Sequence, residues 1–440
     1  MKVFREISIR GLIYLIIAST YFSFMAYFAP LGIDWLPFHS ERIYNFSQYL
    51  KLHGYFENYG FSIWDSKCEN CFSKLNTSPK DIYLSISIFS NFLYVIVNHF
   101  FEKDVFILIG NIIDKILILS SGILISELFI KFSRDDLSFK YIKGILIFTL
   151  FLINPWTYKM FLGQWVIVYF IFFFLIGTFC LTYKKYLFSF LFFFIAGLFD
   201  YQSSLGIVTF YIFVIIILIL KKEKNLINEY FFIKTKNEFL KYKIIFAYLT
   251  PIVLYFVLRS NAYSQLGFSG GSSILERIGI SGNDIYNGGI LGAFQFLAGN
   301  RLSVCLIGNN YSFDSNNLLN TVFIYNCFLS LSSMLIISLI ALFGTLYSIE
   351  KKNYFFKVII LPVLFLLLSY VFILQQSLSV HLMGYSYFFS LIFSFGITNL
   401  IFKILKKNNF KIFYLLFSFP IIIGIVITCI RVNMLTGVNG

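Results

Sequence analysis

Residues 204–224 read SLGIVTFYIFVIIILILKKEK, and this stretch shows the pattern that decides the fold. A long apolar run is followed at once by a basic cluster. Apolar runs approaching 20 residues have the length that a helix needs to cross the hydrocarbon core of a bilayer. The same pattern recurs along the chain, so the sequence predicts an all-α integral membrane protein, a polytopic transmembrane helical bundle.

Composition agrees with this prediction. The chain is 58% hydrophobic and 13% charged, whereas about a quarter of the residues in soluble globular proteins are charged. The net charge of +14 is typical of nucleic-acid-binding proteins, but here the basic residues fall at the ends of apolar runs. In that position they fix membrane orientation by the positive-inside rule, so no nucleic-acid partner is expected.

Six basic clusters hold 23 of the 35 Lys and Arg residues and are interpreted as cytoplasmic: 1–10, 131–143, 184–185, 221–243, 350–357 and 403–411. The apolar runs between them predict about eleven spans, near 11–29, 105–130, 144–162, 164–183, 186–201, 204–220, 244–259, 321–348, 355–373, 382–402 and 411–430. The first run is interpreted as an uncleaved signal anchor with a cytoplasmic N-terminus, in an inner or plasma membrane. The C-terminus is then outside.

The apolar stretch 82–100 does not fit this count. If it crossed the membrane, every later basic cluster would lie outside, including the seven Lys residues of 221–243. We therefore expect an interfacial or half-inserted helix that begins near Pro79 and ends before Glu102. The chain is then a single membrane domain, residues 1–440, with two long outer loops at 30–104 and 260–320.

The first outer loop opens with Asp34, directly after the first span. Ile43, Phe46 and Leu50 then recur at helical spacing, opposite polar residues that include Gln48 and Lys51. This pattern predicts an amphipathic helix on the outer membrane surface. Asp34 would then lie where lipid headgroups meet water.

In this layout the chain resembles the GT-C superfamily of polyprenyl-phosphate-sugar-dependent glycosyltransferases, which contains the protein mannosyltransferases and the aminoarabinose transferase of lipid A. The resemblance covers mainly residues 1–220, leaving 221–440 as further helices, and rests on layout more than on a strict motif. Four features carry it: Asp34 after the first span, the surface helix, a Pro-led helix over Pro79–Phe100, and Asn154-Pro155-Trp156 at the outer end of the third span.

The resemblance implies an inverting transfer of a sugar from a lipid-phosphate donor to a glycan, lipid or protein acceptor at the outer membrane face. Asp34 is the candidate catalytic carboxylate, either as a general base or as a ligand of a divalent metal such as Mg²⁺ or Mn²⁺. Where the family often carries a second acid, this chain has Gln164, which argues against metal-dependent chemistry and leaves Gln164 as a candidate substrate-binding residue. Lys159 nearby is either a phosphate contact or a snorkelling lysine.

Four further polar residues are candidates for substrate binding. Asp200, between two short spans, either caps a helix or binds a ligand. His381 lies at the outer start of the tenth span. It is either a functional residue, which binds phosphate or shuttles a proton, or an ordinary interfacial residue. Arg277 and Arg301 lie in the Gly- and Ser-rich second outer loop and are weaker candidates for binding phosphate.

Asp114 and Lys115 lie inside the second predicted span, where charges are costly and usually face the protein interior. They either pair with polar groups of other helices or line a path for protons or ions. The ion path, together with Asp200, supports a rival function as a transporter or lipid flippase. A second rival, an O-antigen-polymerase-like protein, is suggested by the two long outer loops.

Cys68 and Cys71 lie in the first outer loop, where an oxidising environment favours a local disulfide. A zinc site would need two more ligands, and the sequence has no second paired-cysteine motif. Cys305 and Cys327 are a weaker candidate pair, and Cys180 and Cys429 are expected in the bilayer.

Overall fold

The computed structural model describes residues 2–28, 37–60, 62–63, 82–83, 88–133, 137–160, 166–223, 227–231, 239–266, 335–346, 354–372 and 387–406. Over these residues the chain is helical, apart from one antiparallel pair of two-residue strands. It divides into two compact units that interleave along the sequence. Unit 1 comprises Met1–Pro30, Ile118–Met160 and Gly282–Gly440, and unit 2 comprises Leu31–Leu117 and Phe161–Ser281.

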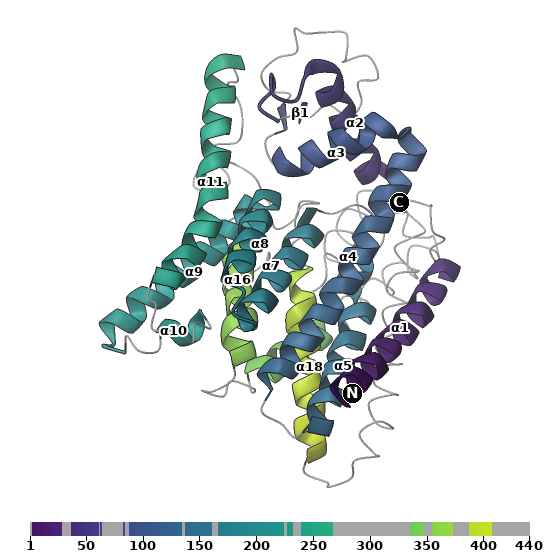
Figure 1. Ribbon diagram of the computed structural model, residues 1–440, viewed down its shortest axis with the longest axis vertical. Helices are drawn as coiled ribbons and strands as arrows, with labels where there is room; N and C mark the ends of the chain where they lie inside the picture. The colour runs from purple at the N-terminus through teal and green to yellow at the C-terminus, as the bar shows by residue number, and fades with distance from the viewer. Residues whose placement is uncertain are drawn as a thin grey trace, which may run out of the picture. The chain divides into compact units, whose positions relative to one another are not determined.

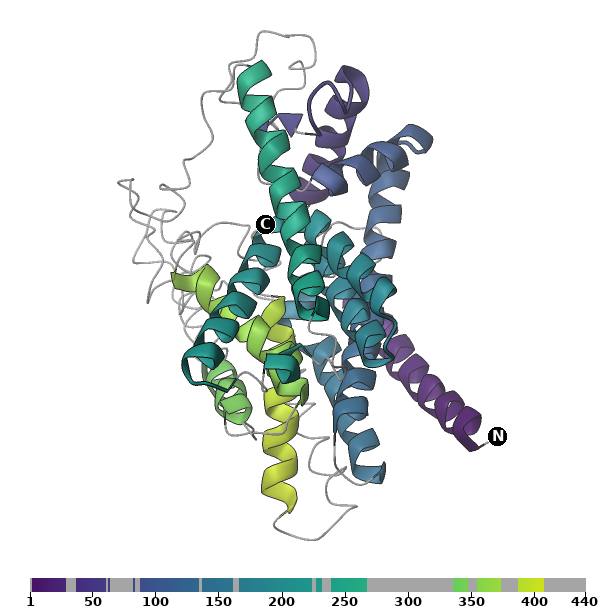
Figure 2. The same ribbon diagram turned by 60° about the vertical axis from the view of Figure 1, so that its left-hand side comes forward.

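Unit 2 contains a small layer formed by residues of the predicted first outer loop, and a group of apolar helices. The layer consists of α2 (Pro37–His53), β1 (Ser62–Ile63), β2 (Ile82–Tyr83) and α3 (Ile88–Phe100). The apolar helices are the first half of α4 (Lys103–Phe132), α7 (Val166–Thr182), α8 (Tyr186–Phe199), α9 (Tyr201–Leu220) and α11 (Phe239–Leu266), with the short α10 (Ile227–Tyr230). Helices α7 and α8 form a hairpin, and α11 packs against α8 and α9 (Figures 1 and 2).

Unit 1 contains α1 (Lys2–Phe28), the second half of α4, α5 (Leu137–Ile153) and α6 (Pro155–Met160). Its later part contributes the helix Leu335–Leu346, the π-helical turn η5 (Phe356–Ile360), α16 (Leu361–Phe372) and α18 (Phe388–Lys406). Helix α18 packs along α5, and α1 packs against α5 from another part of the sequence. This unit has a tightly packed aromatic core in which Trp156 lies against Phe389 and Phe393.

Three helices of the described ranges are long and apolar enough to cross a membrane, judged by length and composition: α4, α9 and Tyr242–Ala262 within α11. Several shorter apolar helices accompany them, and a helix lies within each predicted span that the described residues cover. The long helices expose large side chains such as Ile116 on α4, Phe213 on α9 and Val253 on α11. Soluble proteins rarely expose large contiguous apolar surfaces, and a lipid environment accounts for these side chains.

Two predicted boundaries were wrong. Helix α3 begins at Ile88 rather than near Pro79, because Ile82 and Tyr83, residue types that favour extended backbone, pair with Ile63 and Ser62. The predicted span 144–162 is interrupted after Ile153. Pro155 lacks a backbone N–H and disfavours helical geometry in the residue before it, so α5 ends and α6 begins.

The short α3 agrees with the interpretation that this segment does not cross the membrane. Its 13 residues extend about 20 Å, whereas the hydrocarbon core is about 30 Å thick. In Figures 1 and 2, α3 runs across the start of α4. The apolar residues of α2, Ile43, Phe46 and Leu50, were predicted to face the membrane surface, but they are buried by other parts of the protein. They lie within the protein rather than in lipid, with Ile43 packed in one cluster with Tyr94 and Phe106.

Candidate functional site

Most of the predicted site residues lie outside the part of the chain that the structure describes: Asp34, Gln164, Arg277, Arg301, His381, Cys68 and Cys71, together with Cys305, Cys327 and Cys429. Lys159 lies in α6, where the backbone alone is described. Asp200, Asp114 and Lys115 are described, and Cys180 is a free thiol.

Asp200 joins α8 to α9 and caps both helices. Its backbone N–H donates to Ala196 O at 3.1 Å and closes α8, while its carboxylate accepts the Gln202 N–H at 3.1 Å and the hydroxyl of Ser203 at the start of α9. A carboxylate at this position satisfies N–H groups that have no partner within the helix. The capping alternative therefore describes the observed geometry, and ligand binding by Asp200 stays a prediction.

Replacing Asp200 with alanine is expected to destabilise the chain by about 1–2 kcal/mol, because the first turn of α9 loses its cap. Asparagine caps a helix about as well as aspartate, so Asp200→Asn should unfold close to the wild-type temperature. Thermal unfolding in detergent checks both variants. Equal losses for Ala and Asn would show that the charge of Asp200, not its capping, stabilises the fold.

Asp114 is a second carboxylate in unit 2 and lies on the buried side of α4, with 1% of its surface exposed. The hydroxyl of Tyr169, in the first turn of α7, forms a side-chain hydrogen bond with it. Tyr94 of α3 is close enough to respond to its charge: burial and the negative charge of Asp114 both raise the pKa of Tyr94 well above its usual value. Asp114 therefore lies within reach of side chains from α3 and α7.

A layer of aromatic rings connects the surroundings of this carboxylate with α3. Tyr94 packs edge-on against Phe106 of α4, with 6.1 Å between ring centroids. Tyr169 stacks on Phe199 at 4.7 Å, and Phe89 of α3 meets the same Phe199 ring edge-on at 5.2 Å. These rings bring together α3, the start of α7 and the end of α8. All three were predicted to lie toward the outer face of the membrane.

A polar network fastens α2 to α3. The Gln48 side-chain amide donates to Asn98 Oδ1 at 2.8 Å, and the Asn98 amide donates to Ser47 Oγ at 2.6 Å. The Lys51 ammonium group donates to the backbone carbonyl of Asn98 at 2.9 Å. Gln48 and Lys51 were predicted to lie opposite the apolar face of this helix, in contact with water, but both contact Asn98 of α3. Helices α2 and α3 are therefore held together as one layer.

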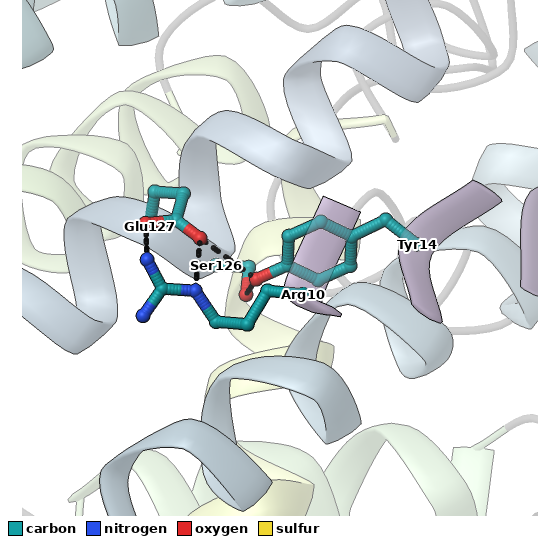
Figure 3. Close-up of polar contacts among 4 residues, drawn as sticks. All are labelled: Arg10, Tyr14, Ser126 and Glu127. Atoms are coloured by element: carbon teal, nitrogen blue, oxygen red, sulfur yellow. Dashed lines mark hydrogen bonds and ion pairs between the residues drawn. The ribbon is translucent and has the colours of Figure 1, made fainter. Parts of the chain in front are cut away.

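Unit 1 contains an ion pair that sequence reasoning missed. Arg10 of α1 faces Glu127 of α4, with Nε 3.4 Å from Oε1 and Nη2 3.5 Å from Oε2 (Figure 3). The Tyr14 hydroxyl donates to Glu127 Oε1 at 3.1 Å and lies 2.7 Å from Ser126 Oγ. The Arg10 guanidinium also lies over the Tyr141 ring of α5, 4.5 Å from its centroid. The only sequence signal was an acid, Glu127, inside an apolar run.

The ends of unit 1 that carry basic residues lie together. Besides the Arg10–Glu127 pair, Phe129 near the end of α4 packs against Phe355, which directly precedes η5, with ring centroids 5.4 Å apart. Near the start of α5, the Lys143 ammonium group lies 5.2 Å from the ring of Phe402, toward the end of α18. Four of the six clusters interpreted as cytoplasmic, 1–10, 131–143, 350–357 and 403–411, adjoin these contacts.

No metal-binding cluster is formed by the described residues, among which no three His, Cys, Asp or Glu side chains are grouped to hold an ion. Comparison of the sequence with protein-family models and with curated proteins finds no match.

Proposed function

We propose that the chain is a polytopic membrane protein of about eleven spans with a cytoplasmic N-terminus, and that it is a GT-C-like glycosyltransferase. In this proposal a sugar moves from a polyprenyl-phosphate donor to an acceptor at the outer membrane face. Asp34 is the catalytic carboxylate, as general base or metal ligand. The observation that carries the proposal is the layer of α2 and α3, which leads directly into the apolar α4 after a short turn.

Two arrangements support the topology within this proposal. In unit 1 the basic ends of α1, α5 and α18 lie together, as the positive-inside rule requires of ends on one side of a membrane. In unit 2 the start of α7 and the end of α8 meet α3. If α3 does not cross the membrane, the number of crossings before each basic cluster places all six clusters on the side opposite α3.

The transfer needs a carboxylate at the outer interface and cationic groups for the leaving phosphate. Asp34 follows the first predicted span directly, and it precedes α2 by only a few residues. Lys159, Arg277, Arg301 and His381 are the proposed phosphate contacts. A lipid-linked donor can enter such a site laterally from the bilayer. The proposed partners are membrane lipid, the polyprenyl-phosphate sugar and the acceptor.

Replacing Asp34 with asparagine is expected to reduce sugar transfer by at least about 100-fold, the range of a lost general base. The assay supplies membranes containing the full-length chain with a panel of radiolabelled polyprenyl-phosphate sugars and measures release of the polyprenyl phosphate. Asp104→Asn, an exposed acid at the start of α4, is the matched control and should retain activity. Full activity of Asp34→Asn at normal expression would overturn the catalytic assignment.

One observation favours the rival function of a transporter or flippase. Asp114 is a carboxylate buried among apolar helices, and such residues commonly mark ion or substrate pathways. The two functions differ in which acid they require. A transporter would lose its activity in Asp114→Asn and keep it in Asp34→Asn, the reverse of what the transferase predicts.

A further inference from the structure

Positive charge is concentrated at one end of unit 1. The ion pair and the ring contacts that join α1, α4, α5, η5 and α18 lie at this end. The described side chains of the unit include six cations: Arg10, Lys131, Lys140, Lys143, Lys357 and Lys403. Among the same described side chains the acid is Glu127 alone. The cations of this unit therefore far outnumber its carboxylates.

The excess of positive charge is also present in the sequence of the segments at this end. The clusters 1–10, 131–143, 350–357 and 403–411 hold 14 Lys and Arg residues and four Asp and Glu residues. If each of these acids and Glu127 neutralised one cation, nine positive charges would still remain. Repulsion among like charges destabilises a compact arrangement, so an anionic partner would stabilise this end of the unit.

Three of the cations gather where α1, α5 and α18 meet. The Arg10 guanidinium lies 4.5 Å from the centroid of the Tyr141 ring, and the Lys140 ammonium group lies 5.7 Å from the same centroid. Lys143 is three residues farther along α5, on the same side of the helix, and lies 5.2 Å from the ring of Phe402. A ring attracts a cation without neutralising its charge. Positive charge from two helices is therefore focused beside these two rings.

The adjoining surface of α1 is apolar. Leu12, Leu15 and Ile16 follow Arg10 along this helix, and each is more than half exposed. A free phosphate ion would leave these side chains uncovered. A phospholipid covers them with its acyl chains while its phosphate reaches the cations, and basic sites between membrane helices bind anionic headgroups in this way.

We propose that Arg10, Lys140 and Lys143 bind the headgroup phosphate of an anionic phospholipid, such as phosphatidylglycerol, in the leaflet on the basic side of the membrane. Lys and Arg donate charge-assisted hydrogen bonds to phosphate oxygens. Each cation near the membrane surface strengthens the binding of anionic lipid about fivefold. The site does not depend on the proposed transferase activity.

The test titrates the purified full-length chain, in uncharged detergent, with phosphatidylglycerol or with phosphatidylcholine of the same acyl chains. Native mass spectrometry gives the affinity for the first bound lipid. The wild-type chain is expected to prefer phosphatidylglycerol at least about tenfold. Lys140→Gln/Lys143→Gln should weaken its binding roughly 25-fold. Lys184→Gln/Lys185→Gln, the same change at two exposed lysines between α7 and α8 of unit 2, is the matched control and should keep the preference.

Single variants cover the case in which the double variant does not fold. Lys140→Gln removes one of the three charges and should weaken phosphatidylglycerol binding about fivefold, whereas Lys140→Arg keeps the charge and should retain the affinity. Equal affinity of the wild-type chain for the two lipids would overturn the proposal. A preference that survives in Lys140→Gln/Lys143→Gln, or that the control loses to the same extent, would overturn it too. Displacement of the lipid by an equimolar amount of inorganic phosphate would show an ion site instead.

Discussion

Replacing Gly396 with valine is expected to lower the unfolding temperature by about 2–4 °C and to reduce the fraction of monodisperse protein. Gly396 lies in α18, where the helix Leu335–Leu346 crosses it in direct backbone contact. A Cβ atom at Gly396 would collide with the carbonyl oxygen of Ala341, and one at Gly344 would collide with the carbonyl oxygen of Gly396. Both collisions are with backbone, which cannot move aside as a side chain can.

The expected loss does not come from helix propensity. Valine is the better helix former of the two residues, so propensity alone would stabilise the variant by a few tenths of a kcal/mol. Overpacking a tight contact typically costs 1–3 kcal/mol and sometimes more, and small residues are the usual means by which membrane helices approach closely. Thr345 adds to this crossing by contacting the Ile392 carbonyl oxygen at 3.3 Å.

Gly11→Val is the matched control, because a Cβ at Gly11 of α1 would have no atom within 4 Å. It should leave the unfolding temperature within about 1 °C of the wild type. Gly396→Ala should fall between the two valine variants, since it adds a single methyl group. Equal behaviour of Gly396→Val and Gly11→Val would contradict the close helix crossing.

Removing the charge of Glu127 is expected to destabilise the chain by about 2–4 kcal/mol. The side chains of Arg10 and Glu127 are only 15% and 26% exposed, and breaking a mostly buried ion pair leaves one charge without compensation. In Glu127→Gln, Arg10 keeps its contact with the Tyr141 ring and loses its counter-ion. The Tyr14 hydroxyl loses a charged acceptor at the same time.

A double-mutant cycle tests this pairing. Arg10→Gln/Glu127→Gln removes both charges and should recover at least half of the stability that Glu127→Gln loses. Urea or detergent-titrated unfolding of the four proteins gives the coupling energy. Strictly additive effects of the two substitutions would mean that the ion pair contributes nothing to stability.

Helix positions were largely predictable from the sequence, because apolar length and flanking charge are local properties. The predicted span 204–220 corresponds to α9, Tyr201–Leu220, and 164–183 corresponds to α7, Val166–Thr182. The predicted helix ends were wrong at two places, Pro155 and the short strand β2, because backbone geometry there outweighs hydropathy. The π-helical turn at Phe356–Ile360 left no recognisable signal in the sequence.

The candidate site was less predictable. The interior position of Asp114 followed from the cost of a charge in an apolar helix, and its burial confirms that prediction. Its neighbours Tyr94 and Tyr169 come from two other helices, 20 residues before it and 55 residues after it in the sequence, and no single sequence reveals such pairings. The same limit applies to Arg10 and Glu127, which are 117 residues apart.

That separation also has a consequence for biosynthesis. A ribosome that adds about 5–20 residues per second needs roughly 6–23 s to make Glu127 after Arg10. During this interval the Arg10 guanidinium group has no Glu127 carboxylate to pair with. The contact between α1 and α4 can therefore form only after α4 has been synthesised, and the spacing of the two charged residues sets the order in which these helices assemble.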